Sequence, residues 1–167
     1  MKRILKFTLI VLMVLFTFNA HAQDAKGLID IGHRFYELGE YLEAIKYLNQ
    51  AADEDNKNPE IFYLLGVCKS QLQHNEEAIK DYNLALTLDP TYGEVYFEKG
   101  YSLFMLSKLE EAIAAFNKAI ELNPENALAY VNRGSVKCIN GDKEGAMQDW
   151  KKAEELGATV PVQGCDM

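Results

Sequence analysis

The sequence of 167 residues contains few of the residues that mark several large protein classes. Its 3 cysteines are too few for a small scaffold framed by disulfides. Its 4 prolines and 11 glycines exclude a collagen-like or low-complexity chain. Bases are also scarce, with 17 Lys and Arg against 25 Asp and Glu and a net charge of −8. This balance argues against nucleic acid as a partner, because phosphates require a basic surface.

Motifs of catalysis and metal binding are absent as well. The chain has no Gly-rich phosphate loop, no Cys-x2-Cys and no His-Glu-x2-His. His33 and His74 lie far apart in the sequence, and no nucleophile, base and orienting group can be nominated together. We therefore expect a protein that is not an enzyme and that has no cofactor and no metal site.

The N-terminus has the pattern of a secretory signal peptide. Lys2, Arg3 and Lys6 precede an uncharged run at residues 7–18, and a small-x-small sequence follows at residues 20–22. The alternative is a membrane anchor, but twelve apolar residues fall short of the ~20 that a spanning helix needs. We expect residues 1–22 to be removed, which leaves no integral membrane span.

Cleavage at this position changes the charge of the working protein. The remaining 145 residues would carry 14 bases and 25 acids, for a net charge of −11. We expect an exported protein, periplasmic or secreted, in a bacterium. Its compartment would be oxidising, so cysteine pairing becomes relevant.

A period of 34 residues organises the rest of the chain. One glycine and two alanines each recur four times at this spacing: Gly32, Gly66, Gly100 and Gly134; Ala44, Ala78, Ala112 and Ala146; Ala51, Ala85, Ala119 and Ala153. Counting from Ala25, the repeats are 25–58, 59–92, 93–126 and 127–160. Such regular self-similarity predicts stacked structural units rather than one globular core.

Each unit is predicted to form two helices. In the third unit Tyr96, Gly100 and Leu103 recur at helical spacing, and Ala112 and Phe116 do the same further on. The glycine at position 8 and the alanine at position 20 are expected where the two helices cross, since an interaxial distance of about 8–10 Å requires small residues there. One helix pair buries too little apolar surface to be stable alone, so neighbouring pairs must stack.

These residues resemble the tetratricopeptide repeat, whose pattern is W-x2-L-G-x2-Y, then A-x3-F, then P. The resemblance covers residues 23–160 and implies an all-α solenoid of four helix-turn-helix repeats, followed by a C-terminal tail at 161–167. The sequence departs from the pattern at position 7, where Lys99 and Arg133 stand, and at position 11, where Lys69 and Lys137 stand.

The resemblance also implies a concave groove lined by the first helix of each repeat. The candidate groove residues are aromatic or apolar: Tyr36, Tyr63, Phe97, Tyr101, Phe104, Met105, Val131 and Ile139. Exposed apolar residues of this kind mark binding sites for other proteins. The alternative is that they pack between repeats as core, and helical spacing alone does not separate the two interpretations.

Some members of the family bind the carboxylate terminus of chaperones through Lys, Asn and Arg side chains on these helices. The corresponding residues here are Ile29, His33, Leu64, Glu94 and Glu98. None of them matches, and the two glutamates have the wrong sign of charge. The resemblance therefore does not extend to that class of ligand.

The three cysteines divide into one isolated residue and one candidate pair. Cys68 is expected to be a buried thiol that behaves as a small apolar residue. The tail that carries Cys165 is long enough to reach Cys138, so a disulfide between them would pin the tail across the last repeat. The alternative is a free or intermolecular thiol.

The sequence thus predicts a protein-protein interaction adaptor of the bacterial cell envelope, which binds an apolar partner segment in its groove. The alternative is a self-associating structural or assembly subunit, a homo-oligomer in which the groove or the end faces pack against another copy. An enzyme is the third interpretation, and no residue supports it.

Overall fold

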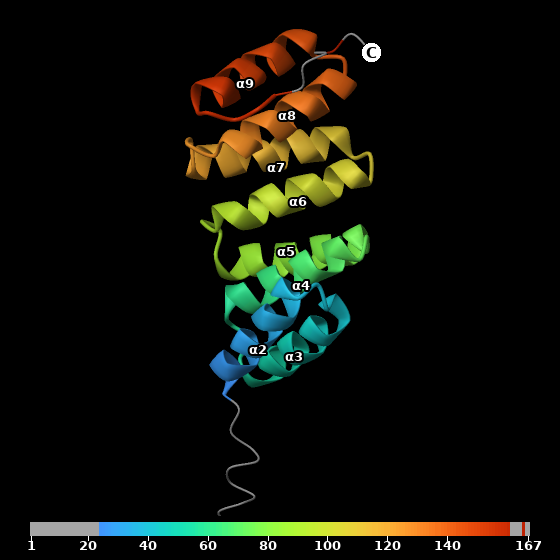
Figure 1. Ribbon diagram of the computed structural model, residues 1–167, viewed down its shortest axis with the longest axis vertical. Coiled ribbons are helices and arrows are strands. Elements are labelled where there is room, and N and C mark those ends of the chain that lie inside the picture. Colours follow the sequence, from blue (N-terminus) through green and yellow to red (C-terminus); the bar gives the residue numbers. More distant parts are fainter. Residues whose placement is uncertain (1–23, 161–164, 166–167) are drawn as a thin grey trace, which may run out of the picture.

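The computed structural model describes residues 24–160 and Cys165, and over these residues it contains eight helices and no strand (Figure 1). The helices are α2 (Ala25–Glu37), α3 (Tyr41–Glu54), α4 (Pro59–Gln71), α5 (Asn75–Leu88), α6 (Gly93–Met105), α7 (Leu109–Leu122), α8 (Ala127–Ile139) and α9 (Lys143–Glu155). The predicted all-α solenoid is confirmed. The signal peptide predicted at 1–22 and most of the tail predicted at 161–167 lie outside the described residues.

Local sequence explains where the helices begin and turn. Asp24 and Asn58 accept hydrogen bonds from backbone N–H groups in the first turns of α2 and α4, which satisfies donors that have no partner inside the helix. Gly39 connects α2 to α3 with φ +77°, a left-handed conformation that glycine adopts without strain. Gln73 and Ser107 have the same conformation between the helices of the second and third repeats, with φ 64° and 59°.

Each pair of helices closes on the contact between the glycine at position 8 and a large side chain at position 24. A Cβ atom added at Gly32 would lie 2.7 Å from Leu48 Cγ, and one added at Gly100 would lie 2.9 Å from the ring of Phe116. The same contact is made in the other repeats, by Gly66 with Tyr82 and by Gly134 with Trp150. The close crossing predicted from the repeated glycine is therefore present in all four units.

A second contact between the paired helices explains why position 11 departs from the family pattern. Position 11 lies opposite position 23, and the two residues match chemically in each repeat: Phe35 with Tyr47, Lys69 with Asp81, Leu103 with Ala115, and Lys137 with Asp149. The first pair stacks with ring centroids 5.4 Å apart. The two lysines form ion pairs with N···O distances of 2.6 and 2.9 Å, and Leu103 and Ala115 are buried in one apolar cluster.

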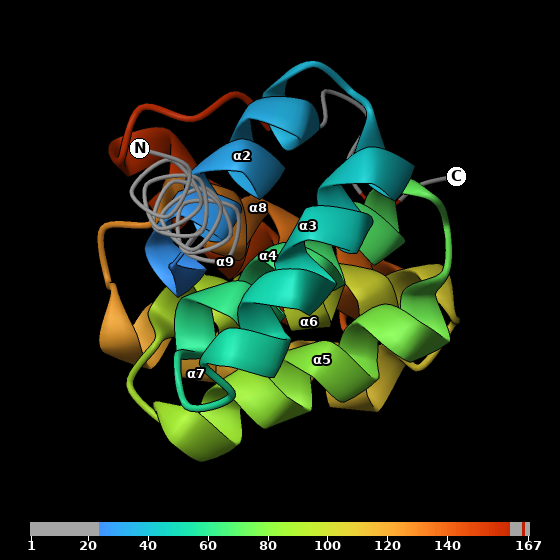
Figure 2. The same ribbon diagram turned by 90° about the horizontal axis from the view of Figure 1, so that it is seen from below.

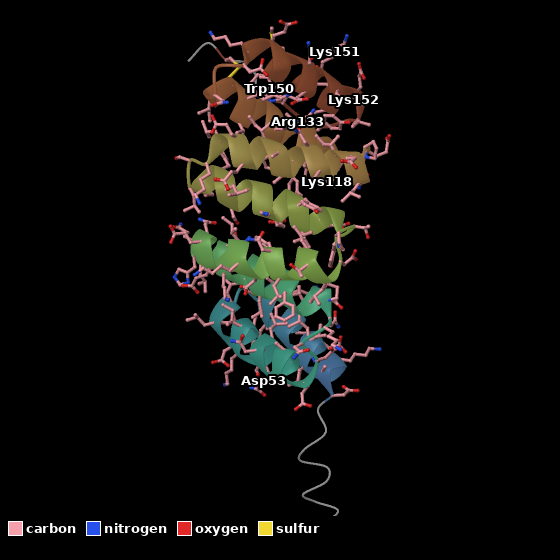
Figure 3. The ribbon with its side chains drawn as sticks, turned by 180° about the vertical axis from the view of Figure 1, so that it is seen from behind. Asp53, Lys118, Arg133, Trp150, Lys151 and Lys152 are labelled. Carbon is pink, nitrogen blue, oxygen red and sulfur yellow. A yellow bond between two sulfur atoms is a disulfide. The ribbon has the colours of Figure 1, made fainter. Side chains whose placement is uncertain are left out.

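The array curves toward its first helices. Consecutive first helices α2, α4, α6 and α8 approach one another within 8 Å between Cα atoms, whereas no such approach joins the second helices α3, α5, α7 and α9 of consecutive repeats. The first helices therefore form the inner, concave layer, and Figure 2 shows the array along its stack. Charged side chains of the second helices, including Asp53, Lys118, Lys151 and Lys152, extend outward from the array (Figure 3).

Candidate binding groove

The structure divides the eight predicted groove residues by exposure. Tyr101, Met105 and Ile139 are exposed, at 41%, 46% and 61% of their surface. The other five, which are only partly buried, are Tyr36, Tyr63, Phe97, Phe104 and Val131. The sequence left open whether these residues line an open groove or pack between repeats, and each interpretation applies to some of them.

Phe97 and Phe104 belong to the core as much as to the groove. The ring of Phe97 meets the ring of Phe116 edge-on, with centroids 5.8 Å apart, and Phe116 is fully buried. Phe104 packs against the same apolar cluster, which Leu103, Phe116 and Val136 help to form. Truncating either side chain would therefore disturb packing between repeats, so neither isolates a binding function.

Tyr101 and Met105 have open surroundings. They line a depression of about 560 Å³, which Leu106 borders after α6, and whose opposite wall comes from the end of α4, the turn that follows it and the start of α5. That opposite wall is polar: Ser70, Gln71, Gln73 and Asn75. An apolar side chain bordered by amide and hydroxyl groups is the usual make-up of a surface that binds an extended peptide.

Aromatic rings continue along the concave layer toward the N-terminal end. Tyr36 lies between His33 and Tyr41, with ring centroids 6.1 and 5.9 Å away. Tyr63 pairs with Tyr92, which immediately precedes α6, at 5.2 Å. Burial, and secondly the charge of Glu98, raise the pKa of Tyr36 and of Tyr63. The hydroxyl groups of these tyrosines therefore stay protonated and remain hydrogen-bond donors at neutral pH.

Glu98 is the residue of this surface that the predicted set of groove residues omits. It stands at position 6 of the third repeat, next to positions 5, 9, 12 and 13, where the eight predicted groove residues lie. Burial raises the pKa of its carboxyl group, and no basic side chain lowers it. Among residues 24–160, no side chain donates a hydrogen bond to this carboxylate or forms an ion pair with it. No sequence signal identifies it, because its burial and its lack of a partner depend on how the neighbouring helices pack.

A small polar cluster lies at the junction of the second and third repeats. Ser102 is completely buried, and its hydroxyl donates a hydrogen bond of 3.3 Å to Ser70. Ser70 donates in turn to Asn75 Oδ1 at 3.4 Å. The hydroxyl of Tyr82 is also completely buried and makes no hydrogen bond of good geometry within the described residues. Polar groups thus continue from the core to the floor of the groove.

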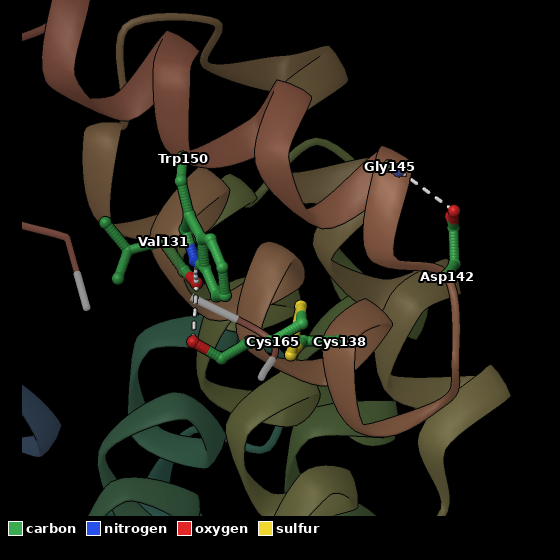
Figure 4. The surroundings of a disulfide bond; sticks show 7 residues. Val131, Cys138, Asp142, Gly145, Trp150 and Cys165 are labelled. Atoms are coloured by element: carbon green, nitrogen blue, oxygen red, sulfur yellow. Dashed lines mark hydrogen bonds between the residues drawn. A yellow bond between two sulfur atoms is a disulfide. The ribbon is translucent and has the colours of Figure 1, made fainter. Parts of the chain in front are cut away.

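The last repeat differs from the others because Cys165 is bonded to its first helix. The structure joins Cys138 to Cys165 as a disulfide with Cα atoms 5.5 Å apart, close to where Trp150 Nε1 donates a hydrogen bond of 3.2 Å to the carbonyl of Val131 (Figure 4). Cys138 stands at a groove position, so Cys165 occupies this part of the concave layer. The depression that Tyr101 and Met105 line lies away from this disulfide, at the junction of the second and third repeats.

Cys68 is unpaired and buried, and burial raises the pKa of its thiol to about 11. A thiol in this state is a poor nucleophile at neutral pH. In the described part of the chain no three His, Cys, Asp or Glu side chains are placed to hold a metal ion. The helices of that part also include none with the length and apolarity needed to cross a membrane.

Comparisons with known proteins agree with this geometry. A family model described as TPR repeat matches residues 32–73 and 100–138, and one described as tetratricopeptide repeat matches residues 59–92. No curated protein sequence matches the chain.

Among solved structures, the crystal structure of MamA superposes with a TM-score of 0.79 at 24% identity, covering 84% of this chain and 82% of that one. The first TPR of Spaghetti (RPAP3), bound to HSP90 peptide SRMEEVD, superposes at 0.69 with 29% identity, covering 71% of this chain and 97% of that one. Since the matched repeats make up more than half of its residues, the chain belongs to the tetratricopeptide-repeat family.

Proposed function

We propose that this protein is a non-catalytic adaptor that holds an extended segment of a partner protein in its concave groove. The observation that carries the proposal is the open depression at the junction of the second and third repeats, where Tyr101 and Met105 are exposed beside polar walls. Aromatic and apolar anchors of this size dominate the binding energy of protein interfaces, at about 2 kcal/mol or more each when they become buried.

The solved relative supports this proposal. The repeat domain of Spaghetti is seen with a bound peptide, and the present chain covers 97% of that domain at 29% identity. Because the backbone superposes over this length, a repeat array of this shape is able to hold a peptide, which supports the proposal. The groove of this chain carries its own side chains, so its partner need not share the sequence of that peptide.

The proposal places the protein in a bacterial envelope. Its support is the pattern of residues 1–22, with three bases, a short apolar run and a small-x-small site. Mass determination of the protein recovered from its source tests this directly, because cleavage after Ala22 leaves a chain that begins at Gln23. Recovery of a chain that still carries Lys2, Arg3 and Lys6 would contradict export by this signal.

A self-associating subunit is the competing function. Leu38 and Leu42 are 74% and 71% exposed near the turn between α2 and α3, so the first repeat presents apolar surface away from the groove. Sedimentation of the processed chain separates the two functions. A monomer whose size does not depend on concentration favours the adaptor, and a concentration-dependent dimer favours assembly.

Partner capture tests the groove itself. In-cell crosslinking followed by mass spectrometry identifies the partner, and the purified partner is then titrated against variants. We expect Tyr101→Ala combined with Met105→Ala to abolish capture while helicity stays near wild type, because both side chains are exposed. Leu84→Ala on α5 is the matched control, since Leu84 is 42% exposed but lies on a second helix. Capture that survives the double substitution would exclude the groove.

A further inference from the structure

We propose that Glu98 and the tyrosines around it form a pocket for one Lys or Arg side chain of the bound segment. The inference rests on the proposed function, since it names the chemistry of the segment that the groove would hold. It predicts a positive charge on the bound segment, which the apolar residues of the groove do not indicate.

The first step is the state of the Glu98 carboxylate. Within residues 24–160 it has no hydrogen-bond donor and no cation, although it is partly buried. A carboxylate that is withdrawn from water without a partner disfavours the folded protein. This chain supplies cations to its other acids between paired helices, where Lys69 pairs with Asp81 and Lys137 with Asp149. Glu98 is left without one on the concave side.

The second step is what surrounds the carboxylate. Its charge raises the pKa values of Tyr36 on α2, Tyr63 on α4 and Tyr82 on α5, in each case after burial, so all three rings lie within electrostatic range of it. Aromatic faces attract cations, and a guanidinium or ammonium group gains from rings and carboxylate together. Tyr82 is fully buried, so only Tyr36 and Tyr63, which are partly buried, could contact such a group directly.

The third step is the charge of the concave layer as a whole. At positions 2, 5, 9, 12 and 13, and at the neighbouring position 6, the first helices of repeats one to three carry five acids, Asp30, Glu37, Glu60, Glu94 and Glu98, against Lys26 and His33 as bases. His33 is already paired with Glu37, with 3.5 Å between the two side chains. A segment with acidic residues would be repelled here, whereas a basic segment is drawn in. Charge complementarity thus selects a cationic occupant.

Stability distinguishes this role from a structural one. A carboxylate that helped to hold the fold would lose stabilising contacts when changed to the neutral amide. A carboxylate kept unpaired for a ligand would cost stability in the free protein, so Glu98→Gln should raise the thermal midpoint at pH 7. Glu94→Gln is the matched control, because Glu94 lies one turn earlier on α6 and is exposed.

Four pools of N-acetylated, C-amidated nonapeptides test the pocket. Each pool has random residues on both sides of a fixed central Lys, Arg, Gln or Glu, and binding to the immobilised processed chain is measured. We expect the Lys and Arg pools to bind about tenfold more tightly than the Gln pool, as one charged hydrogen-bonded contact would give. Glu98→Gln should remove this preference, whereas Glu94→Gln should keep it.

The outcomes separate the two proposals. Equal binding of the Arg and Gln pools to wild type, or a preference that persists in Glu98→Gln, would overturn the cation pocket while leaving the groove intact. A lowered thermal midpoint in Glu98→Gln would also overturn it, because the residue would then be structural. If no pool binds wild type better than it binds Tyr101→Glu, the groove itself is not a peptide site, and the proposed function fails with the pocket.

Discussion

The ion pair between Lys69 and Asp81 provides a quantitative test of how the paired helices match. If positions 11 and 23 form one complementary contact, Lys69 and Asp81 can be replaced together by leucine and alanine, the residues that the third repeat has at these positions. The test compares Lys69→Leu, Asp81→Ala and the double variant with wild type. Each single substitution removes the ion pair, and the double substitution replaces it with an apolar contact.

The magnitudes follow from the burial of the pair. The side chains of Lys69 and Asp81 are 19% and 15% exposed, and Nζ lies 2.6 Å from Oδ2. Removing one member of a buried ion pair costs about 3–5 kcal/mol, and we expect Lys69→Leu to lie near the lower end. Asp81→Ala should cost less, because the flexible lysine can extend its amine to water. The double variant should lie within about 1 kcal/mol of wild type.

The pH dependence gives a second, independent readout on the same variants. Burial raises the pKa of Asp81 even though Lys69 lowers it, and losing the lysine raises it further. A carboxyl whose folded pKa exceeds its unfolded pKa contributes stability below the unfolded pKa and loses it as pH rises through the folded value. The cost of Lys69→Leu should therefore be larger at pH 7 than at pH 4.

Urea unfolding followed by circular dichroism measures all four proteins, and equal m values would show that the compared states are alike. A double variant that loses the sum of the two single losses would refute the reasoning, because the two positions would then act independently. A cost of Lys69→Leu that grows as the pH falls would refute it as well.

A glycine substitution and a thiol count test the remaining structural claims. Gly100→Ala should lower the free energy of unfolding by about 1–2 kcal/mol, because overpacking against Phe116 outweighs the better helix propensity of alanine. Gly93→Ala is the control and should not destabilise the protein, because its added Cβ has no contact closer than 3.4 Å; equal effects of the two substitutions in urea unfolding would contradict this. The denatured, non-reduced protein should expose one reactive thiol, and three free thiols would exclude the pairing of Cys138 with Cys165.

The architecture could be predicted from the sequence because its signals repeat. Glycine at position 8 recurs in every unit, so one packing argument applies four times, and the contacts of Gly32 and Gly100 with large side chains follow from it. Gly39 marks a turn between helices because it needs a positive φ. Gln73 and Ser107 adopt the same conformation without glycine, and no local pattern distinguishes them.

The sequence predicts which face of the first helices lines the groove, but not which residues of that face are open to solvent. Phe97 and Tyr101 stand on the same face at adjacent turns, yet Phe97 contacts Phe116 in the core and Tyr101 borders an open depression. Their difference depends on the curvature of the array, which no single helix encodes. Glu98 was not predicted as a groove residue for the same reason, because its lack of a partner depends on how three other helices pack around it.

Photo-crosslinking in the source organism tests the central claim most directly. A photoreactive amino acid is placed at Tyr101 in one protein and at Leu84 in another, because these side chains are 41% and 42% exposed on a first and on a second helix. The account predicts a crosslinked partner of defined mass from position 101 and none from position 84. Equal crosslinking from both positions, or crosslinking from position 84 alone, would contradict the claim that the concave groove is the binding site.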